Sequence, residues 1–243
     1  MCPSETVAVL YSGGKDSTYA IEMLRRSGYR ISCLVSIISE NADSYMLHTA
    51  SIRATELTAS ALDIPLVFGY TKGEKERELD DIRDSILKSR KDFYFDFIGS
   101  GALCSEYQRS RLAKIAKEIG IGSLAPLWGR DQKSYLREIV RVGYEFILTS
   151  VSAAGLNESW LGKKIDEKAV EEILKLSEKY RFNPALEGGE GETLVLDCPL
   201  YRSKRLVITH YERKWDGTRG ILEIKKAVLV EKNGVSSESI LQT

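Results

Sequence analysis

The stretch TVAVLYSGGKDS, residues 6–17, decides the fold. Its first five residues are apolar or β-branched, which is typical of a buried strand. Beyond it, apolar residues between Tyr19 and Leu24 recur at helical spacing, and the pattern stops at Gly28. The two adjacent glycines therefore lie where a strand turns into a helix. The free N–H groups and the dipole at the start of such a helix favour a bound phosphate.

The loop itself, Ser12 to Ser17, differs from both common phosphate-binding patterns. It is neither the Walker A sequence G-x-x-x-x-G-K-[ST] nor the Rossmann sequence G-x-G-x-x-G. It resembles the PP-loop of the ATP pyrophosphatases, which cleave ATP between its α- and β-phosphates. Backbone amides, two hydroxyls and the charge of Lys15 suit a leaving pyrophosphate, whose charge grows in the transition state. The alternative is a glycine-rich turn without a ligand, and six consecutive matching residues argue against it.

The composition sets limits on the function. The 243 residues include 35 Lys plus Arg and 35 Asp plus Glu, so there is no basic excess of the kind that nucleic-acid binders carry. No apolar run approaches the roughly 18 residues of a membrane span, so no membrane partner is expected. The first strand begins almost at once and leaves no room for a signal peptide. We therefore expect a cytoplasmic protein.

The four cysteines are spread along the chain and form no C-x-x-C pair. This spacing signals neither a zinc site nor a redox pair. It also argues against those PP-loop relatives that transfer sulfur to tRNA with paired cysteines. The cysteines lie at Cys2, Cys33, Cys104 and Cys198.

The first half of the chain alternates strands with helices, which predicts an α/β fold, a parallel sheet with helices on both faces. The resemblance of the loop to the PP-loop implies that this fold is Rossmann-like (HUP-type). Ligands bind such sheets beyond the carboxyl ends of the strands, where the strand order reverses. The loop 12–17, the segment after Ile38 and the turn Gly99–Gly101 should therefore converge on one site. The expected strands cover 6–10, 31–38, 65–70, 93–98, 123–127 and 145–151, and the expected helices after the first cover 50–62, 74–89, 105–119 and 132–142.

The second half changes character and predicts a smaller α+β part. A long amphipathic helix is expected over 166–180, and short strands joined by polar turns follow it. We divide the chain into a PP-loop ATP pyrophosphatase domain, 1–130, and a C-terminal substrate-binding part, 131–243. Whether the second part is an independent domain stays open at this point. The short strands are expected at 194–196, 205–209, 220–224 and 227–230.

The sequence EGGEGET, residues 187–193, is the second informative stretch. An ordinary β-turn with solvated glutamates is one interpretation. However, three carboxylates within six residues repel one another, and this repulsion should raise at least one of their pKa values. Such clusters are tolerated where they bind a cation or a positively charged substrate.

Taken together, the motifs resemble the diphthine–ammonia ligases, the N-type ATP pyrophosphatases that complete diphthamide synthesis. The resemblance covers roughly residues 6–200. One position departs from the family pattern, because relatives often carry an aromatic residue where this chain has Gly191. The matching segments, in chain order, are Ser12–Ser17, Glu40–Thr49, Gly73–Glu76, Gly101–Arg109, Trp128–Asp131, Glu158–Gly162, Glu187–Thr193 and Leu196–Leu200.

The resemblance implies an ATP-dependent amidation of diphthine on translation elongation factor 2. An acyl-adenylate forms, ammonia displaces AMP from it, and diphthamide, AMP and pyrophosphate result. The implied cofactors are ATP and Mg²⁺, with Asp16 as an indirect ligand of the metal, and Lys15, Asp16 and Arg109 are the implied catalytic residues. The implied nucleotide-binding residues are Ser12, Gly13, Gly14, Lys15, Asp16, Ser17, Ser36 and Gly101.

The same resemblance implies a substrate site for a trimethylammonium group, which needs negative charge or an aromatic face nearby. Trp128 or Tyr45 would supply the face, although Trp128 is equally well explained as a core residue. One of the glutamates could instead deprotonate ammonium as a general base, and these two roles stay open. The implied substrate residues are Trp128, Arg130, Glu187, Glu190 and Glu192.

Two other functions are compatible with a PP-loop. One is a tRNA-modifying enzyme, against which the neutral charge and the missing cysteine pair argue. The other is a non-catalytic module that binds adenine nucleotides. For the ligase, the expected partners are elongation factor 2 and ammonia, no direct contact with nucleic acid is expected, and a homodimer is allowed.

Overall fold

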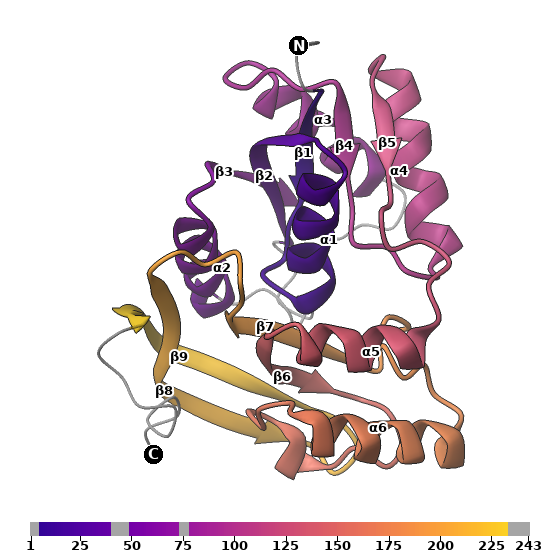
Figure 1. Ribbon diagram of the computed structural model, residues 1–243, viewed down its shortest axis with the longest axis vertical. Coiled ribbons are helices and arrows are strands. Elements are labelled where there is room, and N and C mark those ends of the chain that lie inside the picture. Colours follow the sequence, from indigo (N-terminus) through magenta and orange to yellow (C-terminus); the bar gives the residue numbers. More distant parts are fainter. Residues whose placement is uncertain (1–4, 40–48, 73–77, 233–243) are drawn as a thin grey trace. The chain divides into compact units, whose positions relative to one another are not determined.

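The computed structural model describes residues 5–39, 49–72 and 78–232, and the chain forms two compact units (Figure 1). The units interleave in sequence, because the second unit also takes the glycines and lysine of the loop together with the segment that holds helix α2. The first unit comprises Met1–Ser12, Asp16–Leu47 and Asp63–Trp128, and the second comprises Gly13–Lys15, His48–Leu62 and Gly129–Thr243.

The first unit is built on a parallel sheet of five strands in the order β3-β2-β1-β4-β5. The predicted Rossmann-like fold is thereby confirmed. The chain runs outward from β1 through β2 and β3 and then returns to the other side of β1 with β4, so the order reverses between β1 and β4. The strands are β1 (Thr6–Leu10), β2 (Arg30–Ser39), β3 (Leu66–Thr71), β4 (Phe97–Gly99) and β5 (Gly122–Leu124).

Helices cover both faces of this sheet. On β1, Val7 and Val9 point to the face of the sheet that helix α1 (Lys15–Arg26) covers. Leu24 of α1 lies near both valines, because all three side chains lie next to Gly99. Ala8 points to the opposite face and joins a buried apolar cluster with residues of α3 and α4. Successive side chains of β1 thus pack against helices on opposite faces of the sheet, as expected for a buried parallel sheet. The other two helices are α3 (Glu78–Ser89) and α4 (Glu106–Glu118).

Strand β4 is shorter than the predicted strand 93–98, because the chain ahead of it is held by side-chain contacts. The carboxylate of Asp96 accepts hydrogen bonds from the backbone N–H and the hydroxyl of Thr6, at 2.9 and 3.0 Å. Regular pairing with β1 begins only at Phe97, which lies opposite Val7. The start of the helix predicted over 74–89 falls partly outside the described residues, and the described helix begins at Glu78.

The second unit contains an antiparallel sheet of four strands in the order β7-β6-β9-β8. Its strand β6 (Glu145–Val151) was expected in the parallel sheet, and that expectation is wrong. A strand with neighbours on both sides has the same apolar run in either kind of sheet, so periodicity cannot identify its partners. The remaining strands are β7 (Gly191–Asp197), β8 (Lys204–Trp215) and β9 (Gly220–Glu231).

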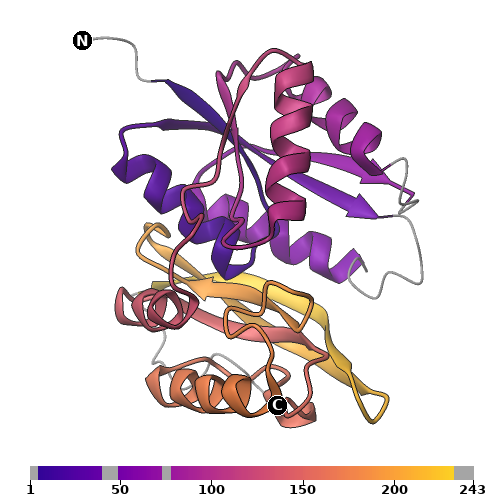
Figure 2. The same ribbon diagram turned by 90° about the vertical axis from the view of Figure 1, so that its right-hand side faces the viewer.

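Strands β8 and β9 form a long hairpin, drawn in light orange and yellow in Figure 2. The two short strands predicted at 220–224 and 227–230 are one continuous strand, and β8 extends past the predicted 205–209. Register shifts near His210 absorb the polar residues that suggested a break. The turn is closed by Asp216, whose carboxylate accepts from the backbone N–H groups of Thr218 and Arg219.

Helix α2 (Thr49–Leu62) packs against β8 and β9. Two further helices, α5 (Gln132–Arg141) and α6 (Glu167–Tyr180), are joined by ion pairs. These link Lys133 to Glu178 and Arg137 to Glu171, each with a shortest distance of 2.6 Å. Asp131 and Asp166 cap α5 and α6, since each carboxylate accepts a backbone N–H in the first turn. A short 3-10 helix, η1 (Glu158–Trp160), precedes α6.

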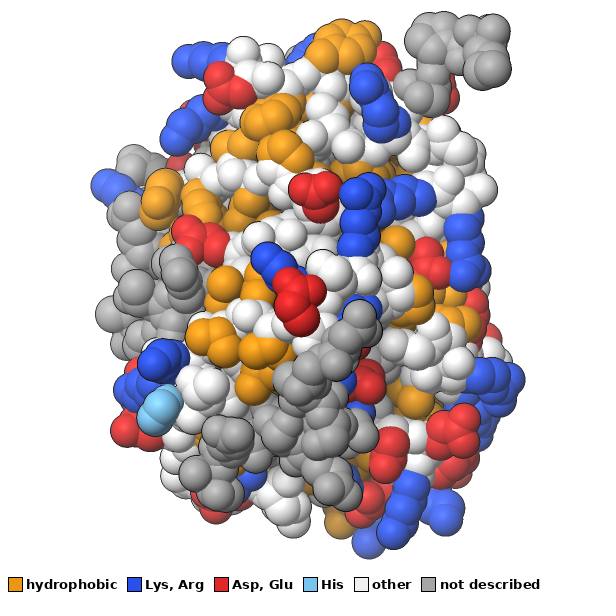
Figure 3. Space-filling model, turned by 60° about the vertical axis from the view of Figure 1, so that its left-hand side comes forward, with side chains coloured by type: hydrophobic (Ala, Val, Ile, Leu, Met, Phe, Trp, Pro, Cys, Tyr) orange, Lys and Arg blue, Asp and Glu red, His pale blue; other side chains and the backbone are white. Residues whose placement is uncertain are grey.

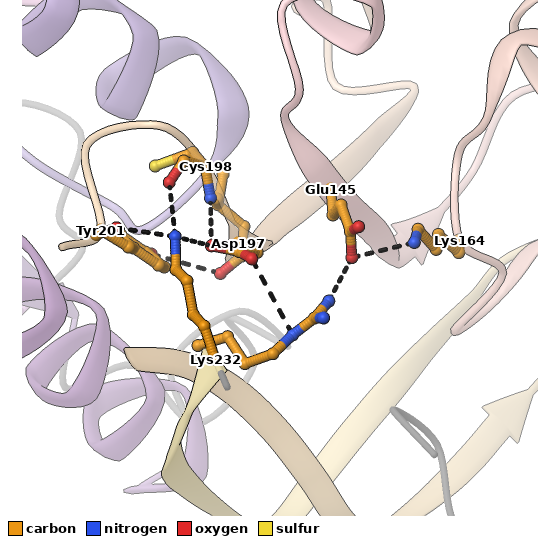
Figure 4. A network of polar contacts seen from close by, with 8 residues as sticks. Glu145, Lys164, Asp197, Cys198, Tyr201 and Lys232 are labelled. Atoms are coloured by element: carbon orange, nitrogen blue, oxygen red, sulfur yellow. Dashed lines mark hydrogen bonds and ion pairs between the residues drawn. The ribbon is translucent and has the colours of Figure 1, made fainter. Parts of the chain in front are cut away.

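A polar network fixes the C-terminal end of β9 to the turn after β7 (Figure 4). The ammonium of Lys232 donates to the carbonyl oxygens of Tyr201 and Cys198 at 2.7 and 3.3 Å. It also pairs with the carboxylate of Asp197 at 2.8 Å. One side chain therefore ties three points of the turn to the final residues of the described chain.

The same network continues to the buried guanidinium of Arg205. This group pairs with Glu145 and lies 4.0 Å from Asp197, and Glu145 also pairs with Lys164 at 2.9 Å. The Nε atom of Arg205 is a buried donor without a hydrogen-bond partner in the described part of the chain. The network contains three cations and two anions, so its net charge is positive.

Candidate functional site

The loop after β1 lies where the strand order of the first sheet reverses, as the sequence predicts. Within the first unit, the hydroxyl of Ser17 accepts from the backbone N–H of Ser12 at 3.3 Å, and the two hydroxyl oxygens lie 3.2 Å apart. Ser12 is exposed and Ser17 is buried. The loop is thus closed on itself by its two serines, and one hydroxyl faces outward.

Gly101, which follows β4, lies directly against this loop in the first unit. A Cβ at that position would be 2.6 Å from the carbonyl carbon of Asp16 and 2.7 Å from the backbone nitrogen of Ser17. Glycine is therefore the residue that lets the two loops meet. The predicted convergence of the loop 12–17 with the turn Gly99–Gly101 is confirmed, whereas the segment after Ile38 lies mostly outside the described residues.

Lys15 is the first residue of α1, and its side chain is only 1% exposed. Within the second unit its ammonium donates to the carbonyl oxygen of Ala185 at 2.6 Å. Its backbone N–H donates to the hydroxyl of Thr193 at 3.0 Å. Both of the polar groups that Lys15 would offer to a phosphate therefore bind oxygens of the segment that contains the acidic turn.

Gly13 fastens the loop to β7 as well. Its carbonyl oxygen accepts from the backbone N–H of Val195 at 3.0 Å. Its φ of +77° is a left-handed conformation that favours glycine, and a Cβ would meet the hydroxyl of Thr58 at 3.3 Å. Gly14 is buried beside it. Asp16 is half-buried in the first turn of α1, where the helix dipole stabilises its negative charge.

The acidic turn is organised by one of its own glutamates. The two carboxylate oxygens of Glu190 accept from the backbone N–H groups of Asn183 and Gly188, at 3.0 and 2.6 Å. The hydroxyl of Ser152 donates to the carbonyl oxygen of Gly189 at 2.5 Å. The backbone N–H groups of residues 152 and 153 donate to the backbone carbonyl oxygen of Glu190. Glu190 therefore shapes the turn, in addition to any role toward a ligand.

Glu192 stands on β7, next to Thr193. Burial raises its pKa to about 7, so the sequence-based expectation of one raised carboxylate pKa holds, but desolvation causes the shift rather than repulsion among the glutamates. Glu187 is half-buried at the start of the turn. The carboxyl group of Glu192 can thus exchange a proton near neutral pH.

The position that departs from the family pattern has a local explanation. A Cβ at Gly191 would lie 2.7 Å from the carbonyl oxygen of Ser150 on β6, the residue before Val151, which lies opposite Gly191. This chain brings β7 closer to β6 there than a residue with a side chain permits. An aromatic ring at this position would therefore need a shift of the strand.

Arg109 and Trp128 are brought together in the first unit, which the sequence did not predict. The guanidinium carbon of Arg109 lies 4.5 Å from the centre of the Trp128 ring, and Glu106 pairs with the same guanidinium at 2.9 Å. Trp128 is 37% exposed, so it is not a buried core residue. Its face is already occupied by a cation, as expected for a ring that can stabilise positive charge.

The other predicted residues lie as follows. Arg130, in the second unit, pairs with Glu138 of α5 at 2.8 Å. Ser36 is buried on β2, directly after Val35, whose carbonyl oxygen accepts from the backbone N–H of Tyr11. Tyr45, the other candidate aromatic face, lies outside the described residues.

The contacts also identify residues that sequence reasoning missed. Thr193 and the carbonyl of Ala185 hold Lys15, and Thr55 and Thr58 of α2 line the position of Gly13. A main-chain carbonyl leaves no signal in a sequence. Thr193 had a signal, because it ends the acidic stretch, but its partner is 178 residues away.

The donor set fits a nucleotide. A buried lysine, a helix start and two serine hydroxyls are groups that bind phosphate oxygens. No cluster of three or more His, Cys, Asp or Glu residues suited to a metal occurs in the part of the chain that the structure describes. Mg²⁺ bound to phosphates needs only one or two carboxylates, and Asp16 is the one on this loop.

Comparisons with known proteins match both halves of the chain. The model of the family "Diphthamide synthase N-terminal domain" matches residues 5–123, and that of "Diphthamide synthase C-terminal domain" matches residues 131–230. The matched ranges leave only a short connection between them.

Several curated relatives share the name diphthine–ammonia ligase. The bovine and human proteins are each 34% identical to this chain over 221 residues, which are 83% of this chain and 82% of theirs. The Schizosaccharomyces pombe protein is 33% identical over 221 residues, which are 84% of this chain but 36% of that longer protein. The chain thus spans about a third of the fission yeast relative and most of the mammalian ones.

Among the helices that the structure describes, none is long and apolar enough to cross a bilayer.

Proposed function

This chain belongs to the diphthine–ammonia ligase family, and we propose that its loop 12–17 binds ATP to activate the carboxylate of diphthine for amidation. The family makes the chain a ligase that forms a C–N bond in diphthamide synthesis. The identity of the residues that carry out each step is our proposal.

One observation carries the assignment of the nucleotide site. The ammonium of Lys15, the start of α1 and the hydroxyls of Ser12 and Ser17 belong to a single loop, and Gly101 packs on its backbone. Hydrogen-bond donors and a positive charge gathered at a helix start favour a polyphosphate. The charge that grows on pyrophosphate as it leaves would be stabilised by the same groups.

The proposed chemistry has two steps. A carboxylate oxygen of diphthine attacks the α-phosphorus of ATP, the bond from this phosphorus to the α–β bridging oxygen breaks, and pyrophosphate leaves with the electron pair. The acyl carbon now carries AMP as its leaving group. Ammonia attacks that carbon, AMP leaves, and the nitrogen loses a proton to give the amide. The first step is needed because a free carboxylate has no adequate leaving group.

We assign the removal of a proton from ammonium or the attacking nitrogen to Glu192. Its pKa of about 7 supports this role, because a general base works best when its pKa is close to the working pH. Glu187 is then the carboxylate for the trimethylammonium group. Glu190 supports both indirectly, since it holds the turn in shape.

The remaining nucleotide and substrate contacts are proposed by position. Arg109 would offset charge on the α-phosphate and Trp128 would offer its face to the quaternary ammonium, after their mutual contact opens. At Gly13, Gly14 and Gly101 the backbone would approach the phosphates. Ser36 would add a contact to the nucleotide, and Arg130 would add one to the substrate. When bound, Mg²⁺ neutralises charge on the triphosphate, and Asp16 is the residue available to it.

The partners follow from the same proposal. Diphthine is a residue of a protein, so the chain acts on a protein substrate, which we propose to be translation elongation factor 2. We place the enzyme in the cytoplasm, where that factor works, and treat a homodimer as compatible with this reaction. The face shown in Figure 3 carries Lys and Arg side chains interspersed with Asp and Glu, and the whole chain has 35 residues of each sign, without the basic excess of a nucleic-acid binder.

The test is product analysis with purified components. The protein is incubated with diphthine-bearing elongation factor, ATP, Mg²⁺ and ammonium, and the nucleotides and the modified residue are identified by chromatography and mass spectrometry. We expect AMP, pyrophosphate and the amide in equal amounts. Formation of ADP, or of no amide at all, would contradict the proposal.

A further inference from the structure

The lysine of the nucleotide loop is held in a position from which it cannot reach a ligand in solution. Its side chain is 1% exposed, and its ammonium donates to Ala185 at 2.6 Å. Its backbone N–H, one of the free donors expected at a helix start, donates to the hydroxyl of Thr193 at 3.0 Å. A carbonyl and a hydroxyl oxygen thus occupy donors that phosphate oxygens would use.

The segment that provides these oxygens, 183–193, is compact and strained. Leu186, directly after Ala185, is buried and adopts a left-handed backbone with φ of +61°. For a residue with a side chain this conformation costs about 1–3 kcal/mol and persists only where the surroundings enforce it. Hydrogen bonds of Glu190 lie on both sides of Leu186, because its carboxylate accepts from the backbone N–H groups of Asn183 and Gly188. Such strain is typical of segments with two conformations.

We propose that segment 183–193 is a latch on Lys15, in which Ala185 and Thr193 store the lysine until the phosphates of ATP replace them. The proposal rests on the assignment of the loop as a nucleotide site. The segment that releases the lysine is the same one that carries the acidic turn. Nucleotide binding therefore releases the substrate-binding turn from Lys15. Thr193 is a positioning residue in this scheme.

The sign of an affinity change tests the latch. Replacement Thr193→Val keeps the β-branched shape but removes the oxygen that competes for the backbone N–H of Lys15. If the stored state competes with ATP, a weaker stored state increases the binding-competent fraction and tightens apparent binding. We expect the dissociation constant for the ATP analogue with a methylene bridge between the α- and β-phosphates to fall about two- to tenfold, as expected for one lost hydrogen bond.

Two comparisons make this titration decisive. Replacement Thr193→Ser keeps the hydroxyl and should bind as the wild type does. Replacement Thr209→Val is the matched control, because Thr209 on β8 also has a hydroxyl that bonds to the main chain, although it donates to the carbonyl oxygen of Lys226 rather than accepting. It should leave the affinity unchanged. Weaker or unchanged binding by Thr193→Val would show that Thr193 merely anchors the loop, and would overturn the latch.

Hydrogen exchange of the wild-type protein provides an independent readout. Addition of the same analogue should speed exchange of the backbone N–H groups within 186–190, because the segment loses its hold on Lys15. Slower or equal exchange in this segment would contradict the latch. If the wild type binds the analogue but these effects are absent, the latch fails and the nucleotide site stands. If the wild type does not bind the analogue, both fail.

Discussion

Gly101 faces the backbone of Asp16 so closely that a Cβ there would lie 2.6 Å from its carbonyl carbon. The turn after β4 and the start of α1 are therefore in direct backbone contact at the point where the strand order reverses. A side chain at position 101 would separate two loops that, in our proposal, bind one nucleotide. Neither loop would need to unfold for the site to be lost.

Replacement Gly101→Ala should abolish nucleotide binding while the protein remains folded. The added methyl group meets backbone atoms, which cannot move away as a flexible side chain does. Calorimetric titration with the methylene-bridged ATP analogue measures the affinity, and thermal unfolding measures stability. Gly28→Ala is the control, because Gly28 has φ of +90° but nothing within 4 Å of a Cβ. It should reduce stability by about 1–2 kcal/mol, the cost of a left-handed backbone for a residue with a Cβ, and leave affinity unchanged. Equal affinities for both variants would contradict the prediction.

Replacement Lys15→Met should reduce the rate of AMP formation by about 10²–10³-fold, the usual effect of removing one donor that stabilises developing charge. The variant should still fold, because an unbranched apolar side chain fits a buried site without the cost of desolvating a charge. Initial rates of AMP release measure the effect. Lys114→Met is the control, since Lys114 is exposed on α4 and lies 4.0 Å from Glu118. A normal rate in Lys15→Met would exclude the loop as the catalytic phosphate site.

Stability should depend on pH through Glu192. The folded carboxyl has a pKa of about 7 against a reference value of 4.5, so the folded state binds this proton more tightly than the unfolded state. The stability that this contributes is fully present below about pH 4.5 and is lost as the pH rises through about 7. Replacement Glu192→Gln removes this loss. At pH 8 the variant should be more stable than the wild type, by up to about 3 kcal/mol.

Chemical denaturation of both proteins between pH 4 and pH 8 measures this difference. The two curves of unfolding free energy against pH should converge at the acidic end and separate above neutrality. Parallel curves over the whole range would show that Glu192 is solvated rather than buried.

Replacement Glu190→Ala should destabilise the acidic turn, because the backbone N–H groups of Asn183 and Gly188 lose their acceptors. The cost is about 1–3 kcal/mol, since the part-buried N–H of Asn183 is left unsatisfied, whereas the exposed N–H of Gly188 can bind water. Glu190→Gln keeps one side-chain oxygen and should lose less. The free energy of unfolding of the three proteins gives the order. If Ala and Gln have the same effect, the carboxylate does not organise the turn.

The charged network of the second unit should respond differently to loss of a cation and loss of an anion. Replacement Arg205→Met leaves Glu145 paired with Lys164 and Asp197 paired with Lys232, so we expect a small change in stability. Replacement Asp197→Asn leaves Arg205 and Lys232 facing a neutral group. It should destabilise the protein by about 1.5–3 kcal/mol, the usual worth of a hydrogen bond to a charged group, because the partly buried ammonium of Lys232 loses its anion. Urea denaturation compares them, and a larger loss in Arg205→Met would refute this charge balance.

Local chemistry made part of this site predictable. The residues of the loop 12–17 place donors, a positive charge and flexible backbone within six positions, so the phosphate site follows from neighbours in the chain. Alternating strands and helices predicted the parallel sheet and, through its switch point, the meeting of this loop with Gly101. The raised pKa among the glutamates was also predicted, although its cause was not.

Other features depend on partners that are remote in sequence. Strand β6 has the pattern of a parallel strand, and only its pairing with β7 and β9 places it in the antiparallel sheet. The ring of Trp128 can bind any cation on its face, and only the folded structure shows that Arg109 is the one that lies there. These outcomes depend on long-range packing, to which residue periodicity is insensitive.

By itself, the sequence determined what the loop is made of and therefore which ligand it can bind, because those groups are covalent neighbours. Only the tertiary structure decided what Lys15 contacts. Its partners are a main-chain oxygen at Ala185 and a hydroxyl at Thr193, 170 and 178 residues away. A carbonyl is common to every residue, so its position is created by folding and cannot be read from side-chain identity.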